Sequence, residues 1–415
     1  MKLSELLKER GYVYQHSSET IEEITDGSKR TVYLGIDPSA DSLHVGNLMG
    51  LLVLRRFLED EHKVILLTGG GTGMIGDPGG KSEERNLLDA ATIKKNSDAV
   101  AAQIRRVFGR ADFIEENNAS WLSKLSLIDF LRDVAKYFTV NAMIKKDIVR
   151  DRLESESPIS FTEFSYSLLQ AYDYLHLNEM YTCDLQVGGS DQWSNILAGV
   201  EYISKKTGKT VYALTWPLIV NKSIGKKFGK SEKGALWLDR EKTSPYDLYQ
   251  FFINVSDDMV EELLLKLTLV PKAEIDALMQ RHVSNAAERA PQRKLADEVV
   301  RLVHGEEGLA EATQMTTVTR DITGTARIVA PESGTIPVAV GTPIIDILTA
   351  SGLASSKSEA RRLVEGRGVR LNGNTIESFD YKIDQKDFTD KRAVLERGNK
   401  RAVLRRMSFF ASLFR

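Results

Sequence analysis

Short apolar runs alternate with longer stretches of helical spacing near the start of the chain. The segments TVYLGI (31–36) and KVILLT (63–68) are apolar runs with β-branched residues, which is typical of buried strands. Between them, VGNLMGLLVLRRFLE (45–59) repeats its apolar residues with the period of a helix. A strand, a helix and a strand in this order form a βαβ unit, so we predict an α/β fold built on a parallel sheet covered by helices.

Helical spacing returns further along the chain. It covers 90–108, 127–140 and 161–177, and a strand–turn–helix pattern follows near 183–200. From Ser244 to about Thr313 the pattern is helical throughout, and the proline after Ser244 marks a helix start. We therefore expect a helical domain after the sheet domain.

The stretch 316–341 has a different character. It is rich in Thr, Gly and Pro and lacks helical period, so we expect an interdomain connection there. Beyond it the pattern predicts two short helices followed by a strand and a turn. The expected parts of the chain are 1–220, 221–315, 316–341 and 342–415.

Charge is unevenly distributed between these parts. The whole chain has a net charge of −2, but residues 341–415 hold 15 Lys and Arg against 9 Asp and Glu. This C-terminal part therefore carries +6 and the remainder carries −8. Such asymmetry indicates either a polyanionic partner held by the C-terminal part or an ordinary solvated surface, and charge alone leaves both open.

Composition excludes several classes of protein. Cys183 is the sole cysteine, so an intrachain disulfide is excluded and a reducing cytoplasm fits. With one cysteine and six histidines, no zinc-ligand spacing is present, and we predict no metal site. No apolar run approaches the roughly 20 residues of a membrane span, and the charged N-terminus lacks the apolar core of a signal peptide.

Two glycine-rich signatures are incomplete. GKKFGKS (225–231) and GDPGGKS (76–82) each have one residue too few between their glycines to form a P-loop. GTGMIG (71–76) has the spacing of a dinucleotide-binding turn, and Asp89 stands near the position of a ribose-binding acid. However, the Pro-Gly-Gly that begins at Pro78 delays a helix, and the turn follows the second strand. Both interpretations are therefore disfavoured.

The loop GIDPSADSLHVGN (35–47) joins the first strand to the first helix. His44 and Asn47 are three residues apart at the helix start, where anions bind, and Gly35 leaves room for a ligand. These side chains could donate hydrogen bonds to a phosphoryl group, or they could only cap the helix. The glycines and the position after a strand favour the ligand site.

A polar row lies along the expected helix 161–177. Tyr166, Gln170 and Asp173 fall on one face, opposite an apolar face that includes Leu168 and Ala171. A polar row faces solvent by default. A binding pocket that requires donors and acceptors would use the same side chains, so this row is a candidate binding surface.

These motifs together resemble a known family. SLHVGN (42–47) is similar to the HIGH signature of class I aminoacyl-tRNA synthetases. KFGKS (227–231) is similar to their KMSKS signature. The closest resemblance is to bacterial-type tyrosyl-tRNA synthetases, through YLGIDPSADSLHVGN, TGMIGDP, SFTEFSYSLLQAYD, LQVGGSDQW and KFGKSEKGALWLD. It extends over essentially the whole chain, although Asn47 replaces a histidine common in the family. The last residues, 407–415, do not resemble the family, and we assign them no role.

The resemblance implies a function and a set of residues. The chain is expected to activate L-tyrosine with ATP and to transfer it to the 3′ end of tRNA(Tyr), with Mg²⁺ accompanying ATP and no organic cofactor or zinc. The residues implied to be catalytic are His44, Asn47, Lys227, Lys230, Ser231, Lys81 and Arg85. Those implied to bind tyrosine are Tyr33, Asp77, Tyr166, Gln170, Asp173 and Gln186. Those implied to bind ATP are Gly35, Asp37, Gly46, Gly189, Asp191, Gln192 and Lys230.

The resemblance also assigns the domains and the partners. It implies a Rossmann-like catalytic domain, an α-helical domain and a small α+β RNA-binding module, and a homodimer formed through the segment near 120–160. The candidate phosphate contacts of the module are Arg361, Arg362, Arg367 and Arg370. The alternatives are a tryptophanyl-tRNA synthetase, which Tyr33 and Asp173 disfavour, and an RNA-binding relative without catalysis, which the two intact signatures disfavour.

Overall fold

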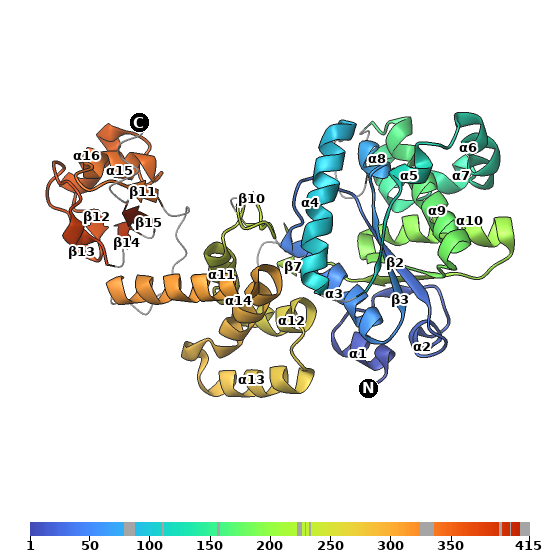
Figure 1. Cartoon of the computed structure of the whole chain (residues 1–415), viewed down its shortest axis with the longest axis horizontal. Coiled ribbons are helices and arrows are strands. Elements are labelled where there is room, and N and C mark those ends of the chain that lie inside the picture. The colour runs from blue at the N-terminus through green and yellow to red at the C-terminus, as the bar shows by residue number, and fades with distance from the viewer. Residues whose placement is uncertain are drawn as a thin grey trace. The chain divides into compact units, whose positions relative to one another are not determined.

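The computed structural model divides the chain into two compact units. It describes residues 1–78, 88–109, 112–155, 158–221, 226–228, 230–231, 234–323, 336–389, 392–398 and 400–406. The first unit comprises Met1–Asp239 and Asp258–Val283, and the second comprises Arg240–Asp257 and Ser284–Arg415 (Figure 1). Among the described residues, no helix has both the length and the apolar character that crossing a membrane requires.

A six-stranded sheet forms the centre of the first unit. Its strands lie in the order β1 (Gln15–His16), β6 (Tyr212–Trp216), β5 (Leu185–Gly189), β2 (Thr31–Ile36), β3 (Lys63–Thr68) and β4 (Ile114–Asn117). All neighbouring pairs are parallel except β1 and β6. The predicted parallel sheet is confirmed, and its first βαβ unit has the predicted bounds, with α3 at Val45–Glu59.

Helices cover both faces of this sheet. Helix α3 packs on β2, β3 and β5, where a Cβ atom on Gly50 would lie 2.8 Å from the Trp216 ring, so glycine permits the close approach. The other face carries α9 (Phe161–Tyr181) and α10 (Trp193–Thr207), which pack against each other (Figure 1). The apolar core on this side includes Tyr33 and Ile65 from the sheet and Tyr174 from α9.

The first unit contains further helices outside these layers. They are α1 (Leu3–Glu9), α2 (Ile21–Thr25), α4 (Ala90–Phe108), α5 (Ala119–Leu122), α6 (Leu127–Asp133), α7 (Val140–Met143), α8 (Asp147–Glu154), α12 (Asp257–Leu267) and α13 (Lys272–Ser284). The helix predicted over 127–140 is divided in the structure. Helix α6 ends at Asp133, the side chain of Val134 is completely buried, and a short 3₁₀ turn follows at Ala135–Tyr137.

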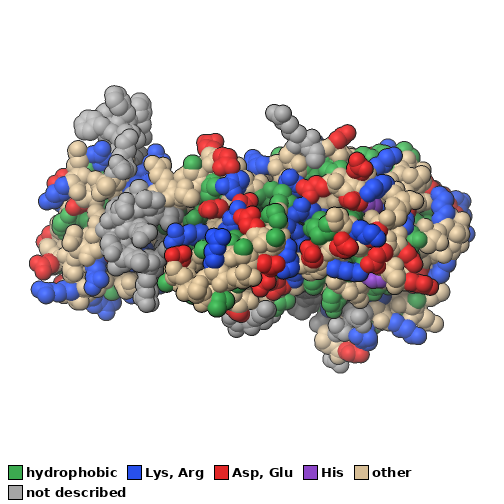
Figure 2. All heavy atoms as spheres, turned by 90° about the horizontal axis from the view of Figure 1, so that it is seen from below, with side chains coloured by type: hydrophobic (Ala, Val, Ile, Leu, Met, Phe, Trp, Pro, Cys, Tyr) green, Lys and Arg blue, Asp and Glu red, His purple; other side chains and the backbone are tan. Residues whose placement is uncertain are grey.

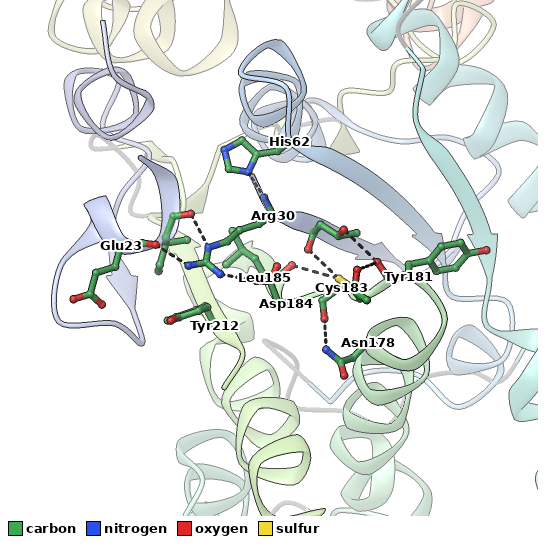
Figure 3. Close-up of polar contacts among 12 residues, drawn as sticks. Glu23, Arg30, His62, Asn178, Tyr181, Cys183, Asp184, Leu185 and Tyr212 are labelled. Atoms are coloured by element: carbon green, nitrogen blue, oxygen red, sulfur yellow. Dashed lines mark hydrogen bonds and ion pairs between the residues drawn. The ribbon is translucent and has the colours of Figure 1, made fainter. Parts of the chain in front are cut away.

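The amino ends of the strands are joined by a charged cluster centred on Arg30 (Figure 3). The Arg30 guanidinium is 2.5 Å from the Asp184 carboxylate, donates to two carbonyls at the end of α2, and lies 4.2 Å from the centre of the Tyr212 ring. The backbone N–H of Arg30 donates to Nδ1 of His62 at 3.1 Å. The side chain and the backbone N–H of Arg30 together therefore connect the starts of β2, β5 and β6 and the residue before β3.

The second unit contains helices and a small sheet. Its helices are α11 (Pro245–Ile253), α14 (Ala290–Thr323), α15 (Ile344–Ala350) and α16 (Lys357–Glu365). Its sheet has the order β11 (Ile336–Val338), β15 (Lys400–Arg406), β14 (Arg392–Arg397), β12 (Val369–Leu371) and β13 (Asn374–Thr375). Helix α14 is kinked at Gly305, where φ is +73°. Its backbone stays helical to Thr323, past the point near Thr316 where the sequence predicts that helical structure ends.

Candidate active site

A cavity of about 440 Å³ opens at the carboxyl ends of β2 and β5 and at the start of α3. It is the expected position for a ligand in an open parallel sheet. The predicted site residues that line it are His44, Asn47, Tyr33, Asp77, Tyr166, Gln170, Asp173, Gln186, Gly35, Asp37, Gly46, Gly189, Asp191 and Gln192. They come from segments far apart in the sequence, and the parallel strands bring them together.

Asp173 is buried in the cavity wall. Its carboxylate is 2% exposed and accepts hydrogen bonds from the Asn118 amide at 2.9 Å and the Trp121 indole at 2.7 Å. Burial raises the pKa of Asp173 to about 7, while the two donors act to lower it. Both the charged and the neutral form of this carboxyl are therefore populated near neutral pH.

The hydroxyl of Tyr33 also faces this cavity. It is buried, and it has no hydrogen-bond partner within the described part of the chain. Burial, together with the nearby Asp173 carboxylate, raises the pKa of Tyr33, so the hydroxyl stays protonated. A buried hydroxyl without a partner costs free energy unless a ligand supplies one.

Like the Tyr33 hydroxyl, the amide oxygen of Gln186 is buried in the cavity wall without a hydrogen-bond partner among the described residues. Gln186 is 2% exposed, and its Oε1 accepts no hydrogen bond from the described residues. Across the cavity, Gln192 donates to Oδ2 of Asp77 at 2.6 Å. A carboxylate and an amide oxygen in one cavity can accept hydrogen bonds from an ammonium group.

A chain of hydrogen bonds connects Asp37 to Asp173. The Tyr166 hydroxyl donates to Oδ2 of Asp37 at 2.8 Å, and the Thr72 hydroxyl donates to Oδ1 at 2.7 Å. Asn118 then donates to both Thr72 and Asp173. The polar row on α9 therefore faces inward, because Tyr166 and Asp173 meet partners from two different loops.

At the start of α3, Asn47 both caps the helix and faces the cavity. Its Oδ1 accepts from the backbone N–H of His44 at 3.0 Å, which leaves its NH₂ group available as a donor. A Cβ atom on Gly46 would lie 2.8 Å from the His44 ring, whereas a Cβ on Gly35 would meet nothing within 4 Å. Glycine at these positions keeps the His44 ring in place and leaves the floor of the cavity open.

The segment after the second signature is paired to this helix start. The N–H of Val45 donates to the carbonyl of Leu236 at 2.9 Å, and the N–H of Leu238 donates to that of Leu43 at 2.8 Å. Phe228 lines the cavity. The side chains of Lys227, Lys230 and Ser231 lie outside the described residues, as do Lys81 and Arg85 entirely.

Sequence reasoning missed the partners of Asp173. Asn118 and Trp121 follow β4, a strand whose polar sequence IEEN gives no apolar run, so neither residue was expected at the sheet edge. The available signal was the Asn-Asn pair at 117–118, since asparagine and serine clusters between periodic segments indicate loops.

The four predicted RNA-binding arginines are exposed and lie close together in the sequence of the second unit. Arg361 and Arg362 are on α16, Arg370 is on β12, and Arg367 lies between them. Where Figure 2 shows this module, Lys and Arg side chains are interspersed with Asp and Glu. Among the described residues, no cluster of His, Cys, Asp and Glu is arranged to hold a metal ion.

Comparisons with known proteins agree with this geometry. A family model of class I tRNA synthetases (W and Y) matches residues 25–318, and a model of the tyrosine–tRNA ligase SYY-like C-terminal domain matches residues 334–404. The chain is 43% identical to the tyrosine–tRNA ligase of Roseiflexus castenholzii, with 95% of this chain and 96% of the relative covered. The corresponding enzyme of Staphylococcus haemolyticus is also 43% identical, with 96% and 97% covered.

Solved structures show the same fold. A C-terminally truncated mitochondrial tyrosyl-tRNA synthetase from Aspergillus nidulans matches with a TM-score of 0.68 at 29% identity, covering 76% of this chain and 94% of that one. The tryptophanyl-tRNA synthetase of Plasmodium falciparum has a TM-score of 0.54 at 12% identity, covering 75% and 86%, and shares the fold alone.

Proposed function

Because the chain belongs to the tyrosine–tRNA ligases of class I, we propose that the cavity of the first unit is where L-tyrosine and ATP react. The enzyme activates tyrosine with ATP and joins it to tRNA. One observation carries the assignment of the cavity. The buried Tyr33 hydroxyl has no partner among the described residues, and it lies in the same cavity as the Asp173 carboxylate, as a phenol-binding site requires.

Tyrosine enters with its phenol toward Asp173. The carboxylate accepts a hydrogen bond from the substrate hydroxyl, and Tyr33 donates to the same oxygen. The substrate ammonium lies near Asp77, Gln170 and Gln186, with Tyr166 beside it. Phenylalanine offers no hydroxyl, so it leaves Tyr33 and Asp173 buried without that partner, and this penalty excludes it.

Adenylate formation requires no protein nucleophile. The tyrosine carboxylate attacks the α-phosphorus of ATP, a phosphorus–oxygen bond forms, and pyrophosphate leaves. His44 and the NH₂ of Asn47 donate to the phosphoryl oxygens as charge develops on them. The remaining catalysis is correct placement of two bound substrates.

The nucleotide occupies the glycine-lined part of the cavity. Gly35 and Gly46 allow the nucleotide to approach the backbone closely. The ribose is contacted by Gly189, Asp191 and Gln192. Asp37 lies beside the nucleotide. Mg²⁺ enters with ATP, held mainly by phosphate oxygens. Lys227, Lys230 and Ser231 act on the leaving pyrophosphate, with Lys81 and Arg85 assisting.

The second step uses tRNA(Tyr). Its terminal ribose hydroxyl attacks the activated carbonyl of tyrosyl-adenylate, and AMP leaves. Arg361, Arg362, Arg367 and Arg370 contact tRNA phosphates, which contributes affinity rather than base reading. Bacterial tyrosine–tRNA ligases among the relatives support a cytoplasmic location.

A homodimer is supported by an apolar surface on the first unit. Leu127 is 70% exposed and Phe161 is 76% exposed, and Ile128 and Val140, which lie between them in the sequence, are also exposed. Exposed apolar side chains mark a protein–protein interface where they form a contiguous patch. Ile128→Glu should convert the enzyme to a monomer in sedimentation; an unchanged dimer would exclude this surface.

Amino-acid-dependent ATP–pyrophosphate exchange tests the proposal, with tyrosine, phenylalanine and tryptophan compared in the absence of tRNA. Exchange with tyrosine alone is expected. Exchange with tryptophan at a similar rate would contradict the phenol site at Asp173. Absence of exchange with all three amino acids would contradict the proposed activation of tyrosine and would favour the alternative of an RNA-binding relative without catalysis.

A further inference from the structure

A side chain from another helix holds the loop that leads into His44. Gln103 is on α4, and its Oε1 accepts a hydrogen bond from the backbone N–H of Leu43 at 2.8 Å. Its Nε2 donates to the hydroxyl of Ser42 at 3.1 Å. Ser42 is 5% exposed and Leu43 is 3% exposed, so these bonds are protected from competing water.

The residues that Gln103 holds also contact the segment after the second signature. The Ser42 hydroxyl accepts from the N–H of Asp239 at 3.2 Å and donates to the carbonyl of Leu43 at 2.7 Å. That carbonyl also accepts from the N–H of Leu238. Both ends of the Gln103 amide therefore act at the point where the loop before His44 meets the segment after the second signature.

Helix α4 holds the other end of the same loop. Asn96, which is buried, donates from Nδ2 to the carbonyl of Pro38 at 2.9 Å. Asn96 and Gln103 are seven residues apart, so two turns of helix place them on one face. The amides fix the loop 38–43 at its start and at its end.

We infer that Gln103 is a positioning residue for adenylate formation, acting through Ser42 and Leu43 on the placement of His44 and Asn47. Gln103 is not among the residues that line the cavity, so it acts without touching substrate. The inference rests on the proposed roles of His44 and Asn47. Small displacements of groups that stabilise a phosphoryl transition state lower the rate strongly, whereas the phenol pocket is held by other segments.

Gln103→Met tests the inference, because methionine keeps the length of the side chain and removes both hydrogen bonds. The kcat of pyrophosphate exchange should fall about tenfold, while the KM for tyrosine and the Tm stay close to those of the unchanged enzyme. Lys94→Met on the same helix is the control, since Lys94 is 78% exposed and pairs only with Asp98 among the described residues. It should leave all three quantities unchanged.

A second variant distinguishes positioning from general packing. Ser42→Ala removes the hydroxyl that Gln103 holds, so the loss of kcat in the double variant S42A/Q103M should be smaller than the product of the two single losses. If the losses of kcat in the two single variants multiply in the double variant, Gln103 does not act through Ser42. A kcat for Q103M within twofold of normal, or losses of kcat, tyrosine affinity and Tm in parallel, would overturn the inference.

His44→Ala, measured alongside, separates this inference from the proposed site. If H44A loses exchange activity and Q103M does not, the site stands and the positioning role of Gln103 is wrong. If H44A keeps normal exchange, the proposed role of His44 is itself wrong.

Discussion

The two edges of the central sheet contain similar side chains arranged in opposite ways. At the amino edge, Arg30 is paired with Asp184, with two carbonyls and with the Tyr212 ring. At the carboxyl edge, the Tyr33 hydroxyl and the Gln186 carbonyl oxygen are buried without partners among the described residues. Oδ1 of Asp184, at the amino edge, also has no hydrogen-bond partner among the described residues, but Asp184 does not line the cavity, whereas Tyr33 and Gln186 do. The amino edge therefore stabilises the fold, whereas in the proposed site the carboxyl edge offers donors and acceptors to substrate.

The difference shows how one sheet can combine stability with binding. Buried polar groups cost free energy when unpaired, so a protein retains them where a ligand completes them. Substitutions at the carboxyl edge should therefore change catalysis and preserve the fold. Substitutions at the amino edge should do the reverse.

The largest effect is expected from Asp173→Asn at the carboxyl edge. Asparagine still accepts from Trp121 but loses the charged acceptor for the substrate phenol. The kcat/KM for tyrosine in pyrophosphate exchange should fall about 100-fold, since a hydrogen bond to a charged partner contributes about 1.5–3 kcal/mol. A variant within threefold of normal would contradict the role of Asp173.

The pKa of Asp173 also determines whether Asp173→Asn raises or lowers the stability of the fold at a given pH. The pKa of Asp173 is about 7 in the folded chain, above its unfolded value of about 4. The carboxyl therefore stabilises the fold most below pH 4, and this contribution is lost as the pH rises to 7. At pH 8, Asp173→Asn should have a Tm equal to or above that of the unchanged enzyme.

At the amino edge, Arg30→Met should act on the fold alone. It leaves Asp184 and two carbonyls without their donor, which should lower the free energy of unfolding by about 2–4 kcal/mol. Urea unfolding, followed by the loss of exchange activity, measures this change. The kinetic constants at low urea should be unchanged, and altered kcat with normal stability would contradict the division between the edges.

A smaller effect is expected from pH. In the proposed site, ionised Asp173 is the form that accepts a hydrogen bond from the substrate phenol, and the pKa of Asp173 is about 7. The kcat/KM for tyrosine should therefore fall about tenfold from pH 8 to pH 6. Asp173→Asn is the matched control: its profile should be flat in this range, and a persisting decline would assign the titration to another group.

The elements with clear periodicity were predicted from the sequence with accurate bounds. The strands 31–36 and 63–68 and the helix 45–59 are apolar enough for pattern alone to locate them. Periodicity did not locate the end of α6 at Asp133, which lies next to Val134, a residue that tertiary contacts bury completely. Local pattern contains no information on such contacts.

The site could be predicted only in part, because local spacing contains no information on contacts between distant segments. Spacing placed Tyr166 and Asp173 on one face of a helix but could not decide whether that face is buried. The decision comes from Asn118 and Trp121, which are 55 and 52 residues from Asp173 in sequence and meet it only in the fold. The resemblance to a family supplied the binding roles that spacing did not.

The most direct test of the contrast between the edges is Tyr33→Phe, which removes one unpartnered hydroxyl and nothing else. The measurement is the ratio of kcat/KM for tyrosine to that for phenylalanine, in pyrophosphate exchange, with the Tm recorded on the same preparation. The account predicts that the ratio falls about 5- to 10-fold, as expected for one lost hydrogen bond, while the Tm stays the same or rises. An unchanged ratio, or a large fall in Tm, would show that the hydroxyl serves the fold and would contradict the account.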